Sequence, residues 1–241
     1  MDGTSSKGGP AMKTPYVSCI MPTANRHLYV PLAVDYFLNQ DFRNAELIIV
    51  DDGKEPVEKL LPQHHRIRYF YTEPLGTIGK KRNFACEKAK GEIILHWDDD
   101  DYYAQDWISR QVQAIDTSGA DICGLDEIIF FSPLRKKYWL YAGAEEGKPW
   151  LAGATLAYRK TFWQGYPFKE IQIGEDYDYI WNSGAKIHAT GYKDGFIATL
   201  HAGNTTLKMF ENPIDKKHAN PFMEVKFEGK AENPEQSKPT S

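Results

Sequence analysis

The chain has 241 residues, of which 41% are hydrophobic and 26% charged, and its formal net charge is −4. This composition is typical of a globular protein with one large domain or two small ones, and the charge excludes a global basic field that would recruit nucleic acid. Three scattered cysteines without a CxxC pair argue against a disulfide scaffold and favour a reducing, cytoplasmic compartment. No apolar stretch approaches the ~20 residues that cross a bilayer.

The two ends of the chain differ in composition from its middle. Residues 1–14 are rich in Gly, Ser and Lys, so we expect a flexible leader there. Residues 225–241 are polar and contain proline, which predicts a disordered tail. Neither a repeat nor a long linker interrupts residues 15–224, and we expect these to form one domain.

The first half of this domain alternates apolar runs with stretches of helical periodicity. The expected strands are residues 16–21, 46–50, 67–71 and 92–97, and the expected helices are residues 28–39, 77–90 and 105–116. Continuous apolar strands separated by helices indicate an α/β fold, with a Rossmann-like, mostly parallel central sheet and helices on both faces.

The second half has a different pattern, in which strand-like segments follow one another with few helices between them. These segments are residues 121–124, 127–131, 138–141 and 154–158, followed by an expected helix over 175–182 and a last strand over 197–201. We expect this mixed half to hold a second substrate.

Four consecutive aspartates, Asp98 to Asp101, come directly after the apolar run Ile93–Trp97. They would lie at the carboxyl end of a buried strand, where open α/β sheets bind ligands. Two unit charges ~6 Å apart repel by roughly 3 kcal/mol at an effective dielectric constant near ~20. The cluster therefore requires a cation, proton sharing or wide exposure. Mn²⁺ or Mg²⁺ suits carboxylate oxygens, and a solvated acidic turn is the alternative.

Five segments, taken in order, resemble the family 2 glycosyltransferases of GT-A fold. They are residues 17–26 (VSCIMPTANR), 48–53 (IIVDDG), 79–83 (GKKRN), 91–101 (GEIILHWDDDD) and 174–178 (GEDYD). The fourth looks like the DxD segment of the family and the fifth like its ED motif. Each segment alone is weakly specific, but the five segments in this order and spacing together form a specific signal. The resemblance covers about residues 16–205 and implies a GT-A domain with a mixed acceptor half.

The resemblance implies a nucleotide-sugar donor, for which a UDP-sugar is the simplest choice, and an acceptor hydroxyl on a carbohydrate or a lipid-linked glycan. The residues that it places around the nucleotide are Pro22, Thr23, Asn25, Asp52, Lys80, Arg82, Asn83, Asp98 and Asp99. Cationic side chains beside the nucleotide can neutralise its phosphates, and arginine binds phosphate bidentately. Structural alternatives stay open for several of these residues. Pro22 and Thr23 could simply end a strand, Asp52 could form a turn, and Lys80 could lie on a solvated helix face.

The same resemblance implies a divalent cofactor, Mn²⁺ or Mg²⁺. Asp100 aligns with the main metal ligand of the family, and Asp98 and His201 are the further candidate ligands. The resemblance also implies that Asp98 or Asp99 contacts the ribose or a metal-bound water. A neutral imidazole can bind Mn²⁺, but a strand-end histidine that bonds only to backbone is the alternative for His201.

Catalysis requires a base, because an acceptor hydroxyl is a poor nucleophile until it loses its proton. Asp176 matches the base of the ED motif, and Glu175 is its neighbour, which would reach the acceptor. The resemblance further implies inversion at the anomeric carbon. Acidic residues in the first turn of a helix are also favoured by the helix dipole, so an ordinary helix start is the alternative.

Two other functions compete with a glycosyltransferase. A domain that binds sugar nucleotide or carbohydrate without turnover would have lost the ED acid or the aspartates, and both are present. A DxD phosphatase normally has Thr or Val where this chain has Tyr102 or Tyr103, which disfavours that class. We expect a cytoplasmic enzyme without a membrane span, which would contact the inner membrane face peripherally if its acceptor is lipid-linked.

Overall fold

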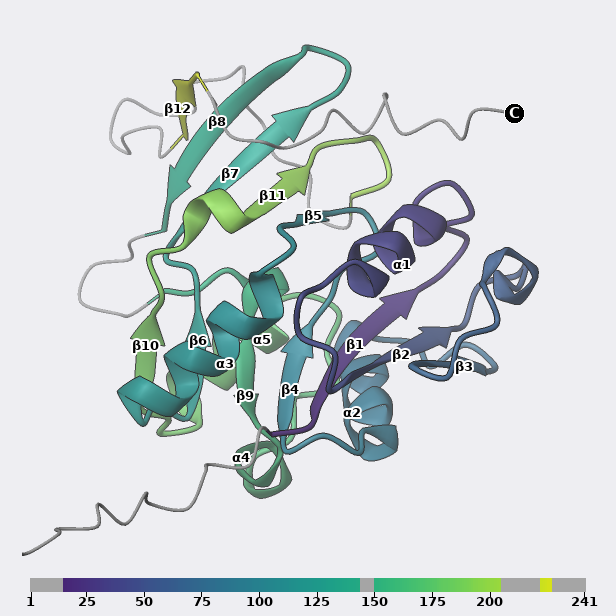
Figure 1. The fold of residues 1–241 in the computed structure, drawn as a ribbon, viewed down its shortest axis with the longest axis horizontal. Helices are drawn as coiled ribbons and strands as arrows, with labels where there is room; N and C mark the ends of the chain where they lie inside the picture. The colour runs from purple at the N-terminus through teal and green to yellow at the C-terminus, as the bar shows by residue number, and fades with distance from the viewer. Residues whose placement is uncertain (1–14, 144–149, 205–221, 227–241) are drawn as a thin grey trace, which may run out of the picture.

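The computed structural model describes residues 15–143, 150–204 and 222–226 (Figure 1). Seven strands form the larger of two sheets, in the order β10-β6-β9-β4-β1-β2-β3. Their bounds are β1 Val17–Thr23, β2 Ala45–Asp51, β3 Ile67–Tyr71, β4 Ile93–His96, β6 Ile122–Gly124, β9 Ala157–Arg159 and β10 Ile187–Ala189. Strands β1 to β4 are mutually parallel where they pair, and β9 runs antiparallel to β4 and β6. The mostly parallel α/β sheet expected from the sequence is confirmed.

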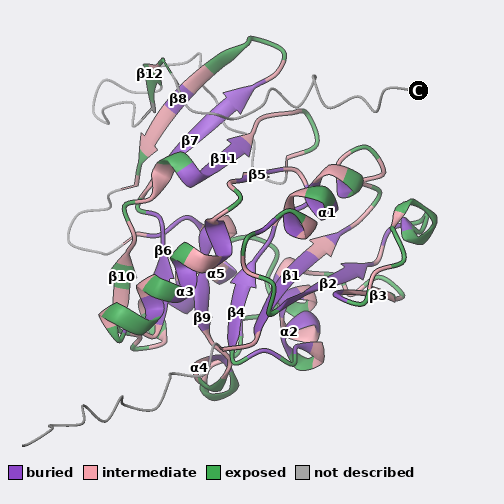
Figure 2. Cartoon of the chain, in the orientation of Figure 1, coloured by how far each residue is buried: buried purple, intermediate pink, exposed green. Residues whose placement is uncertain are grey.

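Helices cover both faces of this sheet, because each central strand is apolar on both of its sides. Cys19 and Leu47 pack into one core with the helices α1 and α3, whereas Ile20 and Ile48 pack into a second core on the opposite face. Figure 2 shows the resulting buried strands between the helices. The helices are α1 Val30–Leu38, α2 Ile78–Lys88, α3 Trp107–Ser118, α4 Lys160–Gly165 and α5 Glu175–Asn182.

Five strands of the second half form a smaller, mixed sheet in the order β12-β8-β7-β11-β5. Their bounds are β5 Tyr102–Tyr103, β7 Glu127–Ser132, β8 Lys137–Ala142, β11 Phe196–Thr199 and β12 Phe222–Val225. Strand β11 runs parallel to β7 and antiparallel to β5. Short 3-10 turns lie at η1 Glu58–Leu60, η2 Gly153–Thr155 and η3 Lys193–Gly195.

Several features of the fold were not predicted from the sequence. The short elements β5, α4, β10 and β12 were missed, and the last predicted strand ends at Thr199, so His201 lies in the loop after β11. Val225 belongs to β12, one residue beyond the predicted end of the domain. Residues 1–14 and 227–241, predicted as leader and tail, lie outside the described residues. Within the described part of the chain, none of the helices has the length and apolar character needed to cross a membrane.

The turn that carries the acidic run is anchored by aromatic packing. Trp97 donates a hydrogen bond from its indole to the Ala33 carbonyl at 3.1 Å and stacks on Tyr103, with ring centroids 3.9 Å apart. The Tyr103 hydroxyl accepts a hydrogen bond from the Asp98 backbone N–H at 2.7 Å. These contacts hold the backbone immediately after β4, so the aspartates start from a rigid support.

Candidate functional site

The carboxyl ends of β1, β2 and β4 meet at one edge of the large sheet, beside a cavity of about 760 Å³. Because parallel strands end at the same edge, residues far apart in the sequence converge there. The sequence-predicted residues that line the cavity are Pro22, Thr23, Asp52, Arg82, Asp98, Asp99, Asp100, Glu175 and Asp176. Asp101 lines it as well. The cavity therefore brings the acidic run and the ED segment together across the sheet edge.

The acidic run is crowded and poorly solvated, and this changes its acid–base behaviour. Burial, together with the neighbouring carboxylate of Asp100, raises the pKa of Asp98 to about 6 and that of Asp99 to about 7. Burial also raises the pKa of Asp101 well above its usual range. Asp99 accepts a hydrogen bond from the Thr23 hydroxyl at 2.5 Å, and Asp101 accepts one from the Thr199 backbone N–H at 2.9 Å. Crowding and burial of the run thus favour proton uptake by its carboxyl groups.

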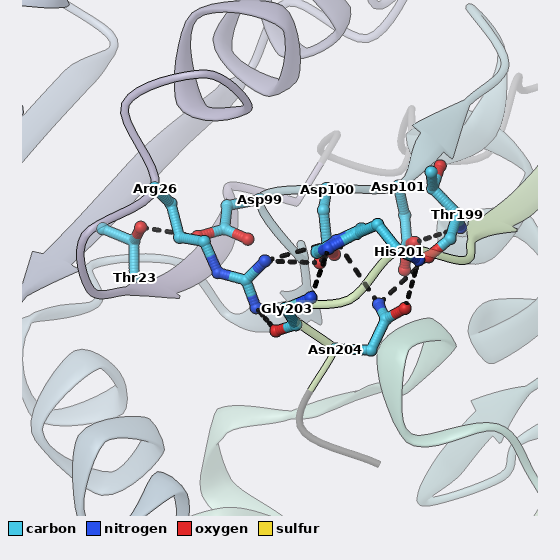
Figure 3. A network of polar contacts seen from close by, with 9 residues as sticks. All are labelled: Thr23, Arg26, Asp99, Asp100, Asp101, Thr199, His201, Gly203 and Asn204. Atoms are coloured by element: carbon cyan, nitrogen blue, oxygen red, sulfur yellow. Dashed lines mark hydrogen bonds and ion pairs between the residues drawn. The ribbon is translucent and has the colours of Figure 1, made fainter. Parts of the chain in front are cut away.

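Asp100 has two partners, which contact the same carboxylate oxygen and lie next to each other (Figure 3). Its Oδ2 accepts a hydrogen bond from His201 Nε2 at 2.8 Å and lies 3.3 Å from Arg26 Nη1. The Arg26 side chain also donates from Nη2 to the Gly203 carbonyl at 2.6 Å. His201 does not line the cavity itself, but its ring stacks on Tyr29, with centroids 4.5 Å apart. Asp100 and His201, which were both predicted as metal ligands, thus lie next to each other in the fold.

The contacts of His201 indicate which ring nitrogen carries the proton. Its Nδ1 accepts a hydrogen bond from the Gly203 backbone N–H at 3.0 Å, which assigns the proton of the neutral ring to Nε2, 2.8 Å from Asp100 Oδ2. Arg26 Nη1 and Asn204 Nδ2 lie 3.2 Å and 3.4 Å from the same Nε2. A protonated nitrogen cannot bind a metal ion, because its lone pair is used. His201 can therefore become a ligand only after its proton moves and its bond to Gly203 changes.

The ED segment begins helix α5 on the other side of the cavity. Glu175 is buried and forms an ion pair with Arg82, whose guanidinium is also buried. Burial raises the pKa of Glu175, and Arg82 opposes that rise. Asp176 accepts a hydrogen bond from the Tyr177 backbone N–H at 2.9 Å, and a Cβ built on Gly153 would lie 2.2 Å from its Oδ2. Gly153 thus provides the space in which the Asp176 carboxylate lies.

The end of the cavity nearest β1 and β2 contains a second ion pair. Lys81 Nζ lies 2.5 Å from an oxygen of Asp52 and donates to the Thr23 carbonyl at 3.1 Å. The other oxygen of Asp52 accepts a hydrogen bond from the Leu75 backbone N–H at 3.1 Å. Asp52 is thereby held at the cavity edge with oxygen atoms facing a polar, partly open region.

Three residues predicted to contact the nucleotide are not among those that line the cavity. Asn83 accepts hydrogen bonds from the Trp163 indole and the Phe168 backbone N–H and donates to the Phe168 carbonyl, so it joins α2 to the segment after α4. Lys80 is exposed on the outer side of α2. Asn25 has a φ of 57° and accepts a hydrogen bond from the Lys54 backbone N–H at 2.8 Å. The contacts of Asn83 and Asn25 support structural roles.

Arg26, Lys81 and Gly153 also line the cavity, although they were not among the predicted site residues. For Lys81 a signal existed, because positions three and four residues apart share a helix face. Ala85 is buried on α2, so its i−4 neighbour Lys81, rather than Lys80, turns toward the sheet. The close approach of Gly153 to Asp176 has no comparable local signal, because it depends on a helix that begins 22 positions later in the chain.

A divalent ion fits this donor set only in part. Among the described residues, no group of three or more carboxylate, imidazole or thiol side chains is arranged to hold a metal ion. Asp100 and His201 nevertheless offer a carboxylate and an imidazole within 2.8 Å of each other beside the cavity. Magnesium sites commonly use one or two protein carboxylates and complete their shell with substrate phosphates and water. The residues present fit an ion of that kind.

The model of the glycosyl transferase family 2 matches residues 18–172, more than half of the chain, and the chain belongs to that family. An uncharacterized glycosyltransferase of Haemophilus influenzae is 33% identical over 106 residues, which are 42% of this chain and 42% of the relative. A GalNAc(5)-diNAcBac-PP-undecaprenol beta-1,3-glucosyltransferase of Campylobacter jejuni is 32% identical over 117 residues, 46% of this chain and 38% of the relative. The matched stretches thus span less than half of these curated relatives.

Solved structures share the fold at low sequence identity. TarS 1–349 of S. aureus in complex with UDP has a TM-score of 0.59 and 20% identity, and the match covers 77% of this chain and 60% of TarS 1–349. The mannosyltransferase PcManGT of Pyrobaculum calidifontis, in complex with GDP-Man and Mn²⁺, has a TM-score of 0.61 and 16% identity, over 78% of this chain and 57% of that protein. The GT-A fold and the family expected from the five sequence segments are confirmed.

Proposed function

We propose that this chain transfers a sugar from a nucleotide sugar, a UDP-sugar, to an acceptor hydroxyl with inversion. The observation that carries the proposal is the single cavity that brings the acidic run after β4 together with Asp176 at the start of α5. A displacement at an anomeric carbon needs two elements at once: a group that stabilises the leaving diphosphate and a base for the attacking hydroxyl. The two acidic segments supply one element each.

The charge of the cavity supports a divalent cofactor, Mn²⁺ or Mg²⁺. Among the described residues that line it are seven carboxylates but only three cationic side chains, and two of these cations are already paired with Asp52 and Glu175. A diphosphate would add further negative charge to this excess. A divalent ion held by Asp100 and His201 would supply Lewis-acid stabilisation of the leaving diphosphate. Asp98, the third predicted ligand, lies in the same run.

On the acceptor side, Asp176 is the proposed general base. Its carboxylate is positioned by the Tyr177 backbone N–H and by the absence of a side chain at Gly153. The neighbouring Glu175 is paired with the buried Arg82, so we assign Glu175 a positioning role in place of the predicted acceptor contact. The hydroxyl proton would pass to Asp176 as the oxygen attacks, while the sugar–phosphate bond breaks on the opposite face.

On the donor side, the pocket edge formed by Pro22, Thr23 and Asp52 is the proposed site of the nucleoside. Asp52 presents carboxylate oxygens, which can accept hydrogen bonds from a base N–H or a ribose hydroxyl. Lys81 lies beside it and adds a positive charge near the expected phosphates. Asp98 and Asp99 keep their predicted place near the ribose and phosphates.

The relatives support the choice of substrates. TarS binds UDP and UDP-GlcNAc in its structures, which favours a uridine nucleotide, and the name of the Campylobacter jejuni relative describes a lipid-linked acceptor. We therefore propose a carbohydrate or lipid-linked acceptor. The cytoplasmic location and the peripheral contact with the inner membrane face stay predictions, and the proposal involves no nucleic acid.

Radiolabelled nucleotide sugars, incubated with the protein and Mn²⁺, test this function. We expect one UDP-sugar to be hydrolysed or transferred by the wild type. Asp176→Asn should bind UDP with nearly unchanged affinity but lose turnover by about 10²–10⁴-fold, the usual contribution of a general base. Asp116→Asn, which changes an exposed ion pair with Arg159, is the matched control. Binding without turnover in the wild type would favour the catalytically silent alternative, and full turnover by Asp176→Asn would refute the assignment of the base.

A further inference from the structure

Arg26 occupies the position of a counter-ion for Asp100. Its Nη1 lies 3.3 Å from Asp100 Oδ2, and the two side chains are only 18% and 11% exposed. The guanidinium is charged at every accessible pH, so it supplies permanent positive charge to a carboxylate of the acidic run. The other described cations of the cavity, Lys81 and Arg82, are paired with acids outside that run. Arg26 is therefore the cation that contacts the run among the described residues.

The same contacts occupy Asp100 Oδ2 and both ring nitrogens of His201, so these atoms must exchange partners before they bind metal. Asp100 Oδ2 receives Arg26 and the Nε2 proton of His201, while His201 Nδ1 receives the Gly203 N–H. Arg26 in turn donates to the Gly203 carbonyl at 2.6 Å, so it fixes the loop on which this pattern depends. A metal ion that arrives alone competes with the guanidinium for the Asp100 carboxylate and disturbs this loop when it binds His201.

A diphosphate changes this balance because it offers the guanidinium a better partner. Arginine binds phosphate oxygens bidentately, and a diphosphate presents several such oxygens. By contrast, Asp100 offers the Arg26 guanidinium a single oxygen contact at 3.3 Å. Arg26 lines the cavity in which the donor is expected, so phosphate oxygens can come within its reach. Each ligand then removes an obstacle for the other: the diphosphate takes Arg26, and the metal takes Asp100.

We propose that Arg26 is an exchangeable counter-ion, which passes from Asp100 to the donor diphosphate and thereby makes metal and diphosphate bind as a pair. This inference rests on the proposed function, and it assigns to Arg26 a role in the order and coupling of ligand binding. Coupling between two ligands is reciprocal, so each must raise the affinity for the other by the same factor.

Titrations of Mn²⁺ and UDP, each alone and in the presence of the other, test the exchange without any turnover. Electron paramagnetic resonance measures free Mn²⁺, and calorimetry measures UDP binding. In the wild type we expect a coupling factor of about 10–100, within the usual range for two coupled sites. In Arg26→Gln we expect tighter binding of Mn²⁺ alone, by several-fold, and a coupling factor reduced at least about five-fold.

Two further variants make the titration decisive. Arg26→Lys keeps the charge but not the bidentate geometry, so Mn²⁺ alone should bind as in the wild type while the coupling weakens. Arg110→Gln breaks an arginine–aspartate pair with Asp106 outside the cavity and should change neither affinity. An unchanged coupling factor in Arg26→Gln, or weaker binding of Mn²⁺ alone, would overturn the exchange. A wild type that binds neither ligand would instead overturn the proposed function, and the exchange with it.

Discussion

The two acidic segments of the cavity balance their charge in different ways. Glu175 has a buried, fixed partner in Arg82, on a different element of the fold. The aspartates after β4 have different partners: Asp99 accepts a hydrogen bond from a hydroxyl, Asp101 accepts one from a backbone N–H, and Asp100 contacts the Arg26 guanidinium. The pKa of Asp99 is also raised. A carboxylate with a fixed partner contributes to structure. Carboxylates balanced by protons and one replaceable cation are prepared to receive a ligand.

The comparison also separates two ways of positioning a carboxylate. Asp100 is approached by side chains from the β1–α1 loop and from the loop after β11 (Figure 3). Asp176 is positioned by the start of its own helix and by a missing side chain at Gly153. The first arrangement can change when its partners move, whereas the second is determined by the local backbone. This difference suits a site that binds and releases an ion on one side and holds a base on the other.

The largest difference between the acidic run and the ED segment should come from Asp100→Asn, which affects Mn²⁺-dependent binding of UDP. The substitution keeps the volume of the side chain but removes the charge that attracts both Arg26 and a divalent ion. We expect the Mn²⁺-dependent affinity for UDP to fall by at least about a hundred-fold, since the ion contributes several kcal/mol at such sites. Calorimetry with and without Mn²⁺ measures this loss. Asp116→Asn should bind as the wild type does, and Mn²⁺-dependent UDP binding that survives in Asp100→Asn would remove Asp100 from the metal site.

A smaller effect should come from Gly153→Ala on the other side of the cavity. The added methyl group would lie 2.2 Å from Asp176 Oδ2, so the carboxylate must move aside. Because this atom is the end of a flexible side chain, stability should change little. Displacement of a base by about 1 Å can lower kcat by roughly a hundred-fold, and we expect a loss of about ten- to a hundred-fold.

Steady-state kinetics and a thermal melt check this prediction together. The KM for the donor should stay within about two-fold, because Gly153 does not contact the proposed nucleotide side. Gly165→Ala is the matched control, since a Cβ at Gly165 meets no atom within 4 Å. Equal kcat values for the two alanine variants would show that the position of Asp176 does not depend on Gly153.

The smallest effect concerns stability and pH in the absence of metal. The pKa values of Asp98 and Asp99 are raised to about 6 and about 7, so between pH ~4 and pH ~7 the native state binds more protons than the unfolded chain. The free energy of unfolding must therefore fall as the pH rises through this window. In Asp99→Asn the dependence should be weaker, and at pH 8 the variant should be more stable by about 1–2 kcal/mol, or a Tm higher by a few degrees.

Thermal melts from pH 5 to pH 8, with and without Mn²⁺, measure this dependence. Mn²⁺ should reduce the fall in stability, because the ion binds the deprotonated carboxylates of the native state only. Asp116→Asn, which alters an exposed carboxylate, should leave the slope unchanged. A metal-free protein whose stability rises between pH 5 and pH 8 would contradict the proton uptake by the acidic run.

Much of the fold was predictable because its signals are local. The apolar runs of β1, β2 and β4 are read directly from the chain, and strands that are buried on both faces imply covering helices. Helix α5 was predicted with the bounds that the structure shows, since Gly174 precedes it and its first turn is acidic. By contrast, β9 has three residues and enters the sheet antiparallel between β4 and β6, a pairing that no local pattern encodes.

The candidate site was predictable to a similar degree. The acidic run and the ED segment were identified as motifs, and their joint lining of one cavity agrees with that prediction. The contacts within these motifs were not predictable, because neighbours in sequence point in different directions. Asn83 bonds to the segment after α4, whereas Arg82, one residue before it, lines the cavity.

The chain by itself determined most of the strands and helices in their order, the family, and the acidic residues at the strand ends, because periodicity and short motifs are properties of neighbouring positions. Only the tertiary structure decided which partner each charge has. Arg26 is 74 positions before Asp100, and His201 is 101 positions after it, yet all three side chains meet. Such encounters depend on how strands of two different sheets end beside each other, and a linear pattern contains no measure of that distance.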